Sequence, residues 1–176
     1  EETGAAQHFR DARILPIYEG TTAIQANDLV FRKTLRDGGA AVNQLLDEID
    51  IEMQALEKHD NNSVAANASH LRRAIEPARD ATKHILAAAN TPRRPAVNGV
   101  NYLMMLGRLC GGWMMARASD RASIMLLDPA SDPSFMQAKL ASAQIFMTHH
   151  LPQVHALAAT IMTGDDAVLA MDADWL

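Results

Sequence analysis

The stretch AAVNQLLDEIDIEMQALEK, residues 40–58, decides the fold class of this chain. Its apolar residues recur at steps of three and four, at Val42, Leu45, Leu46, Ile49, Met53 and Leu56. That spacing places them along one face of an α-helix, with charged side chains on the opposite face. The stretch therefore predicts an amphipathic helix that must bury its apolar face against other elements.

Three more segments with helical periodicity follow, at residues 64–89, 97–127 and 134–163. Short turns rich in Asp, Asn, Ser and Pro separate the four segments. Amphipathic helices joined by short turns predict an all-α fold, and an antiparallel up-down four-helix bundle is the simplest architecture. We expect the segment 97–127 to be the most buried, because its first half is apolar nearly all round.

Single residues refine this prediction of a bundle. Pro77 and Pro152 lie inside the second and fourth segments, where proline removes a backbone hydrogen bond and bends the helix. Gly164 is a suitable C-terminal cap for the fourth. The third segment carries Gly107, Gly111 and Gly112, which weaken a helix but permit close contact with its neighbours.

The first residues are organised differently from the bundle. A helical pattern covers residues 4–14, Pro16 ends it, and a second helix is expected from about Thr22, which can cap it, through Leu35. The sequence Asp37-Gly38-Gly39 then predicts the end of that helix. We therefore divide the chain into a helix-loop-helix segment at 1–37, a bundle at 38–164, and an acidic tail at 165–176 that is most simply solvated.

Composition excludes several classes of function. The formal net charge is -5, which argues against nucleic acid or an anionic membrane as a main partner. Neither a signal peptide nor an apolar run long enough to span a bilayer is present. The single cysteine, Cys110, excludes an internal disulfide and fits a cytoplasmic location. Because the chain begins with Glu1-Glu2-Thr3-Gly4, we expect it to be a fragment of a longer protein.

Some residues suggest chemistry that their surroundings do not favour. Cys110 lies in an apolar run and is better explained as a small buried hydrophobe than as a nucleophile. The methionines at 104, 105, 114 and 115 could line an acyl channel, but filling of the core is the commoner role. His149, His150 and His155 do not share one helix face, so we expect no metal site.

The stretch RDARILPIYEGTTAIQ, residues 10–25, is the most informative for function. It predicts a loop that presents the carboxylate of Glu19, beside Gly20 and just before the next helix. Such a carboxylate can act as a general base or can simply stabilise the start of a helix. The residues alone favour the second role, because acidic residues near helix N-termini are common.

The same stretch resembles the signature near the C-terminal end of the acyl-CoA dehydrogenases. The matching positions are Arg10-Asp11, Ile17-Tyr18-Glu19-Gly20-Thr21 and Ile24-Gln25, with a lead-in at residues 2–7 that matches the bacterial branch. The remaining helices resemble, more loosely, the extra C-terminal domain of the larger bacterial members, which include enzymes acting on methylthio- and long-chain acyl-CoAs. The pattern at Leu151-Pro152, 157–159 and Gly164 carries this second resemblance.

The resemblance implies a role for each matching residue. Glu19 corresponds to the base that removes the α-proton of the acyl-CoA thioester, while hydride leaves the β-carbon for the flavin. The backbone amide of Gly20 corresponds to a group near the thioester, and Thr21 and Gln25 correspond to positions near FAD. Arg10, Asp11 and Arg13 are expected to hold the helix and loop in place. The chain departs from some relatives at Ala23, whose side chain cannot reach the cofactor as a polar residue could.

For the parent protein, the resemblance implies an FAD-dependent dehydrogenase of fatty acid β-oxidation. Its partners would be an acyl-CoA substrate, an electron-transfer flavoprotein, the remainder of its own chain, and a second copy in a homodimer. The fragment alone is expected to be inactive, since the flavin-binding domain lies elsewhere. The alternative is a non-catalytic helical module for interaction or dimerisation.

Overall fold

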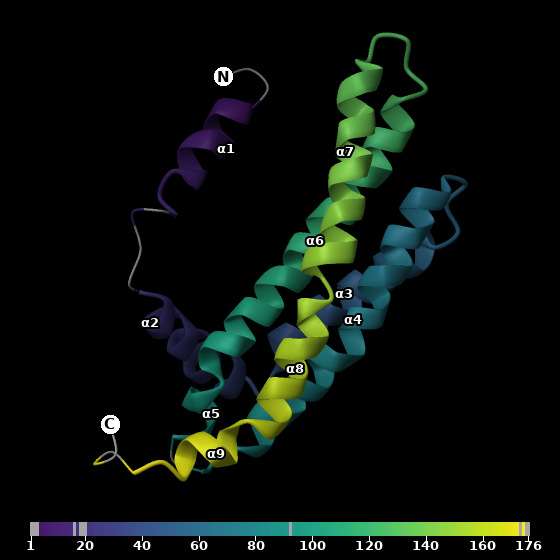
Figure 1. Cartoon of the computed structure of the whole chain (residues 1–176). Helices are drawn as coiled ribbons and strands as arrows, with labels where there is room; N and C mark the ends of the chain where they lie inside the picture. Colours follow the sequence, from purple (N-terminus) through teal and green to yellow (C-terminus); the bar gives the residue numbers. More distant parts are fainter. Residues whose placement is uncertain (1–3, 16, 18–20, 92, 173, 175–176) are drawn as a thin grey trace.

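The computed structural model describes residues 4–15, 17, 21–91, 93–172 and 174, and across these residues there is no β-strand. Four long helical runs form an antiparallel up-down bundle, as predicted (Figure 1). The runs are α3 Ala40–Leu56, α4 Asn62–Ala87, α6 Gly99–Met125, and a fourth built from α7 Pro133–Ile145, the π-helix η2 Phe146–His150 and α8 Gln153–Thr163. The short helix α5, Arg94–Val97, lies between α4 and α6.

Before the bundle come α1, Ala5–Ala12, then α2, Thr22–Asn27, which continues as the π-helix η1, Asp28–Leu35. Figure 1 shows α1 standing away from the bundle, whereas α2 lies against the first half of α6. The π-helix η1 packs on α3, α4 and α6. The second half of the helix-loop-helix segment is thus attached to the bundle, and the division at residue 37 stays a prediction.

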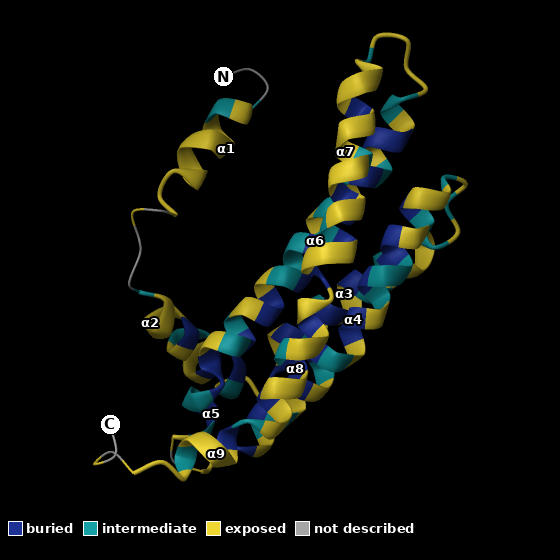
Figure 2. Ribbon diagram, in the orientation of Figure 1, coloured by how far each residue is buried: buried dark blue, intermediate teal, exposed yellow. Residues whose placement is uncertain are grey.

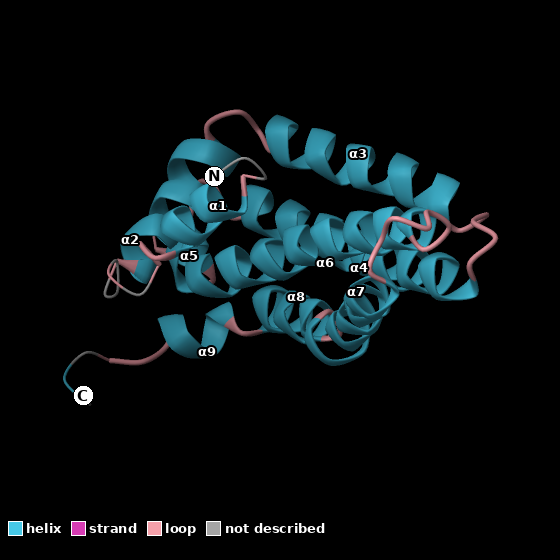
Figure 3. Ribbon diagram, turned by 90° about the horizontal axis from the view of Figure 1, so that it is seen from above, coloured by secondary structure: helices cyan, strands magenta, loops and turns pink. Residues whose placement is uncertain are grey.

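The core runs along the axis of the bundle (Figure 2) and draws on η1 as well as on all four long helices. Figure 3 shows α4 and α6 between α3 on one side and α7 with α8 on the other. The helices α4 and α6 bury ten residues each, so the expectation that the segment 97–127 is the most buried is wrong. Because α4 packs against every other long helix, it shares the central position. The buried residues form one contiguous core that spans residues 30–161, as in a unit that can fold by itself.

Side chains and glycines mark the ends of the helices where the sequence predicted turns. Asn61 accepts hydrogen bonds from the backbone amides two and three residues ahead, and Asp132 does the same at the start of α7. Such N-caps satisfy amides that have no partner within the helix. After η1, Gly38 and Gly39 adopt φ of 64° and 79°, which glycine reaches without strain. The predicted end of the helix at 37–39 is confirmed.

The two internal prolines have different consequences. Around Pro77, α4 remains one helix from residue 62 to residue 87. At Pro152, the fourth run is interrupted: η2 ends at His150, and α8 begins at Gln153. The wide turn of η2 and the following break are the kind of local adjustment that proline favours. The predicted disruption is therefore confirmed at Pro152.

Of the glycines at 107, 111 and 112, two lie where a neighbouring helix approaches α6 closely. A Cβ atom at Gly111 would lie 2.8 Å from the Phe146 ring, and one at Gly112 would lie 3.1 Å from Leu71. The prediction of close helix contact is confirmed at both positions. At Gly107 a Cβ atom would meet nothing within 4 Å, so the prediction is wrong there.

Alanine substitutions separate these two situations. Both Gly107→Ala and Gly111→Ala gain helix propensity, but only the second must displace the Phe146 ring. We expect Gly107→Ala to raise the free energy of unfolding by about 0.5–1 kcal/mol. Gly111→Ala should be less stable than Gly107→Ala by about 1–3 kcal/mol, the usual cost of overpacking. Urea denaturation followed by circular dichroism measures both, and equal stabilities would contradict the packing described for Gly111.

The start of the acidic tail is buried, contrary to the expectation of a solvated segment. Residues Asp165–Leu169 form α9, which packs on α5 and α8. The Asp165 carboxylate is 2% exposed, and its Oδ2 lies 3.1 Å from both His84 Nε2 and Arg94 Nη1. Asp166 also binds Arg94 but is exposed. The expectation of solvation is therefore wrong for Asp165, because a tertiary ion pair draws it onto α4 and α5.

The surroundings of Asp165 stabilise its charged form. Burial raises the pKa of the carboxyl, but the hydrogen bond with His84 and the charge of Arg94 outweigh burial, so the pKa lies below its ordinary value.

Helix α8 ends just before Gly164, where a Cβ atom would lie 2.8 Å from the Thr160 carbonyl oxygen. Gly164 caps α8 as predicted, but it does so in the right-handed region, with φ of -91°.

Removing the negative charge of Asp165 should weaken the packing of α9 on the bundle. Asp165→Asn is expected to lower the free energy of unfolding by about 1–3 kcal/mol, between the values for exposed and fully buried pairs. Asp166→Asn, on the exposed neighbour, should change it by less than about 0.5 kcal/mol. Because the folded-state pKa of Asp165 is depressed, its contribution is complete above the ordinary Asp pKa of 3.8 and is lost as the pH falls below it. Unfolding curves at several pH values test this, and a difference that grows in acid would refute it.

Candidate functional site

Only two of the four residues predicted to form the site are among the described residues. Glu19 and Gly20 lie outside the described residues, so the predictions for them remain predictions. Thr21 and Gln25 are described, and α2 carries both. Thr21, and not Thr22 as expected, is the N-cap of this helix.

Thr21 and Gln25 are brought together by the first turn of α2. The backbone amide of Gln25 donates to the carbonyl of Thr21 at 2.9 Å, so the two residues are one helical turn apart on one face. Gln25 is exposed and Thr21 is half-buried. Both residues therefore lie at the start of α2, on a part of the helix that is at least partly accessible.

Behind this face, Ala26 attaches α2 to α6. Ala26 is 1% exposed, and a Cβ atom at Gly99 would lie only 3.5 Å from the Ala26 Cβ. Two small residues thus let the helices meet at the start of α6. The close crossing sets where the N-terminal end of α2 lies relative to the bundle.

A buried group of hydroxyls extends this attachment into η1. Thr34 of η1, Thr82 of α4 and Tyr102 of α6 are all buried. Thr82 donates to the Ala78 carbonyl, so it accepts the hydrogen bond from the Tyr102 hydroxyl at 3.1 Å. Burial raises the pKa of Tyr102, and the hydroxyls of Thr82 and Thr34 act in the opposite direction. The Thr82–Tyr102 hydrogen bond links α4 and α6. The Thr34 hydroxyl of η1 is buried but has no hydrogen-bond partner among the described residues, so packing alone holds η1 here.

The first residues of the signature, Arg10 and Asp11, lie in α1 and take part in hydrogen bonds within that helix. Within α1, Gln7 donates to Asp11 at 2.8 Å and accepts from Arg10 at 3.2 Å. These bonds stabilise the helix, in line with the structural role expected for Arg10 and Asp11. No residue of α1 is buried, and the large apolar side chains on this part of the chain are exposed, namely Phe9, Ile14, Leu15, Ile17 and Ile24. Of these exposed apolar side chains, Ile24 lies on α2 beside Gln25.

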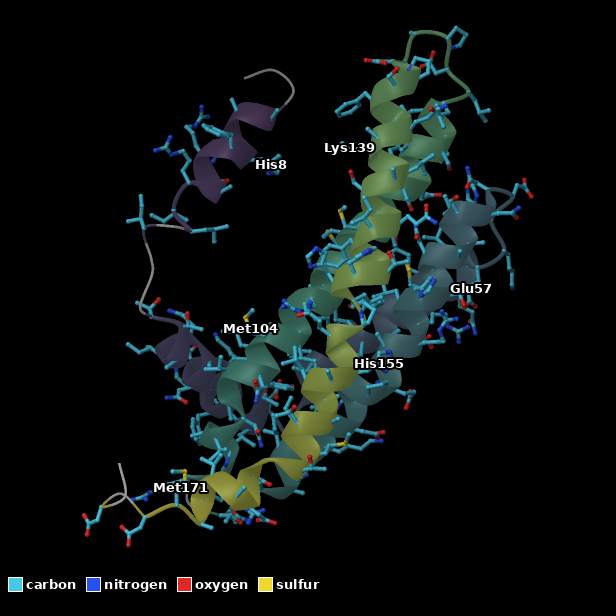
Figure 4. All side chains as sticks on the ribbon, in the orientation of Figure 1. His8, Glu57, Met104, Lys139, His155 and Met171 are labelled. Carbon is cyan, nitrogen blue, oxygen red and sulfur yellow. The ribbon has the colours of Figure 1, made fainter. Side chains whose placement is uncertain are left out.

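The structure also shows where the other residues considered from the sequence lie. Cys110 is half-buried, and burial raises the pKa of its thiol, which does not favour a nucleophilic role. Met105 lies in the core as expected, but Met104, labelled in Figure 4, is 40% exposed and Met114 is 46% exposed. Core filling is therefore the wrong interpretation for these two methionines.

The histidines near the break in the fourth run have local contacts. The ring of His150 lies 5.3 Å from that of Phe146, and His149 Nδ1 is 2.8 Å from the Thr148 hydroxyl. Over the described part of the chain, no three His, Cys, Asp or Glu residues gather closely enough to hold a metal ion. In the same residues no helix is both long and apolar enough to cross a membrane.

Sequence reasoning missed the Asp165 ion pair and the hydroxyl group around Tyr102. Each joins residues far apart in the sequence: Thr82 and Tyr102 are 20 positions apart, and His84 and Asp165 are 81 positions apart. A helical pattern indicates which face is buried but not which helix it meets. The sequence offered one signal for such buried polar contacts: a polar residue on the apolar face of a predicted helix, such as Thr82.

The chain is similar in sequence to known proteins over nearly all of its length. A model of the family described as "Acetyl-CoA dehydrogenase C-terminal like" matches residues 40–172. The chain is 40% identical over 174 residues to 3-methylmercaptopropionyl-CoA dehydrogenase of Ruegeria pomeroyi, an alignment that covers 96% of this chain and 29% of that protein. It is 30% identical over 174 residues to broad-specificity linear acyl-CoA dehydrogenase FadE5 of Mycobacterium tuberculosis, which covers 94% of this chain and 28% of that protein. The chain thus spans less than a third of the length of these relatives.

The crossing of α2 and α6 can be tested with two matched substitutions. Ala26→Leu adds a side chain where α2 meets Gly99, and we expect it to destabilise this contact by about 1–3 kcal/mol. Ala23→Leu, on the exposed face of the same helix, should have little effect. Hydrogen exchange followed by mass spectrometry should show faster exchange in residues 22–35 for Ala26→Leu alone. Equal exchange in the two variants would mean that this crossing does not hold the segment.

Proposed function

The chain belongs to the family of acetyl-CoA dehydrogenase C-terminal-like domains, and we propose that it is the C-terminal part of an FAD-dependent acyl-CoA dehydrogenase. The parent would oxidise an acyl-CoA thioester to the trans-2-enoyl-CoA. One observation carries the proposal: the signature at residues 10–25 precedes a bundle of the matching family, in a chain similar to two dehydrogenases along almost its whole length.

The proposed base is Glu19. It takes the α-proton of the thioester, and the backbone amide of Gly20 hydrogen-bonds near the thioester oxygen, where negative charge develops. The α-proton is only weakly acidic, so its removal requires a carboxylate base with a raised pKa in a site that excludes water. The described residues around this segment are exposed, so the walls that exclude water must come from the rest of the parent chain.

The described residues fit one edge of a flavin site. Thr21 offers a hydroxyl and Gln25 an amide on the same face of α2, and such groups hydrogen-bond a cofactor without bringing in charge. We propose that these two residues hold FAD in the parent. When bound, FAD supplies the acceptor for the hydride that leaves the β-carbon. Ala23, which lies between them, contributes no polar side chain.

The remaining partners follow from this assignment. An electron-transfer flavoprotein would receive the electrons, a homodimer is the proposed assembly, and a cytoplasmic location suits the single cysteine. A second candidate function is a helical interaction module, which the exposed apolar residues of α1 and α2 favour. The mass of the native protein discriminates between the two, since only the enzyme needs a chain several times longer.

The chemical test is Glu19→Gln in the full-length enzyme, with an acyl-CoA substrate added under anaerobic conditions. We expect the rate of flavin reduction to fall by a factor of about 10² to 10⁴, the usual contribution of a positioned general base. Glu48→Gln, on the exposed surface of α3, is the matched control and should reduce flavin at the normal rate. Near-normal reduction by Glu19→Gln would assign the base to another residue.

A second measurement tests whether the chain of 176 residues binds FAD by itself. Without the rest of the parent, we expect it to show neither flavin reduction nor tight stoichiometric binding of FAD. Absorbance of the protein after gel filtration with excess FAD measures this directly. Stoichiometric retention would show that the site is built by this chain alone.

A further inference from the structure

A groove opens between η1, α3 and the first half of α6, on a surface that the proposed function does not use. Its volume is about 330 Å³. The lining residues are almost entirely apolar, and the ones that matter for the argument are Leu29, Lys33, Ala41, Leu103, Gly107 and Cys110. The volume lies at the lower end of the range of about 300–1,000 Å³ in which small molecules bind to proteins.

The groove exists because small residues line it where larger side chains would fill it. Gly107 has no side chain, and a Cβ atom there would meet nothing within 4 Å. Ala41 contributes only a methyl group, on the first turn of α3. Leu29 and Leu45 are half-buried and pack on the core, and both also line the groove. Such a surface is favourable for an alkyl chain, since each covered methylene leaves water.

The charge on the lining of the groove is positive. Lys33 is the one charged residue among those that line it, and its side chain is exposed. Its neighbour Arg32 is paired with Asp28 at 2.8 Å, whereas across the described residues Lys33 has no ion pair. Asp37, one turn further, directs its carboxylate to the backbone amides of Gly39 and Ala41. The ammonium group of Lys33 is thus available to an anion whose apolar part lies in the groove.

A second groove on the other side of Gly107 has a different character. Its volume is about 370 Å³, and Arg108 and His150 line it. The Arg108 guanidinium already donates to Gln153 at 2.8 Å, and the His150 ring lies against Phe146. The cation of this groove is therefore fixed by a hydrogen bond to Gln153, whereas Lys33 has no such partner among the described residues.

From these observations we propose that the groove between η1, α3 and α6 binds a medium-chain carboxylate, with the alkyl chain along Leu29 and Leu103 and the carboxylate at Lys33. The ligand class is set by one apolar channel and one free cation at its end. Because the groove is open, only part of the chain's surface is covered. We therefore expect affinity to rise by about twofold to fourfold for each added methylene until the groove is full.

Cys110 supplies a reporter inside the groove. It is the one cysteine of the sequence, it lines the groove, and it is half-buried. Its rate of alkylation by N-ethylmaleimide can be followed by mass spectrometry in the chain of 176 residues, whose buried residues form one contiguous core. A ligand in the groove should slow this reaction in proportion to its occupancy. Decanoate should protect Cys110 at lower concentration than octanoate or hexanoate, and butyrate should not protect it.

Two variants and one control connect the protection to this groove. Ala41→Phe places a ring in the channel and should weaken protection by decanoate at least about tenfold. Ala55→Phe, at an exposed site near the other end of α3, should leave it unchanged. Lys33→Gln should weaken protection about threefold, as expected for an exposed ion pair, and Lys33→Arg should restore it. Circular dichroism establishes whether each variant is folded. If Ala41→Phe fails to fold, the substitutions at the exposed Lys33 still test the proposal.

Other outcomes overturn the proposal. Absence of protection by decanoate below its micelle concentration means that the groove does not take an alkyl chain. Protection that is equal in Ala41→Phe and wild type places the ligand elsewhere. Equal protection by decanoate and decyltrimethylammonium means that the groove does not select an anion. None of these results depends on whether the parent is a dehydrogenase, because the experiment measures only binding to this chain.

Discussion

Close approach of neighbouring helices to α6 is the constraint on which the rest of the structure depends. The helix meets α2 at Gly99, where the opposing residue is Ala26, and it meets η2 and α4 at Gly111 and Gly112. A helix with ordinary side chains at these positions would hold its neighbours further away. The two sets of contacts lie at different heights of one long helix. Therefore α6 determines both how the bundle closes and where the signature segment emerges from it.

Polar contacts specify the arrangement that this packing allows. The hydroxyls of Thr82 and Tyr102 lie in the core with Thr34 beside them, and the Asp165 carboxylate lies against Arg94 and His84. Buried polar groups are costly unless they are satisfied, so each group favours one arrangement of its helices over alternatives that leave it unpaired. The Thr82–Tyr102 pair joins α4 to α6, and the Asp165 ion pair holds α9 against α4 and α5.

The candidate site follows a different physical logic from the bundle. Its described residues are attached at one end, through Ala26 and η1, while the apolar side chains at the other end are exposed. Proton abstraction from a thioester requires a dry and enclosed site. The exposed Ile24 side chain beside Thr21 and Gln25 is consistent with a surface that another part of a larger protein covers. The bundle would then act as a support that positions one wall of the site.

The sequence by itself determined the helices, their ends, and the family. Periods of three and four residues, the caps at Asn61 and Asp132, and the glycines at 38 and 39 act over one or two turns, so local physics is enough to predict them. The signature at residues 10–25 predicted a role for Glu19 through resemblance, not through spacing. Only the tertiary structure decided that α4 shares the centre with α6, that Asp165 is buried, and that Gly107 faces open space while Gly111 does not. These features depend on which helix faces meet across many residues of sequence, and helical periodicity carries no information about the partner of a face.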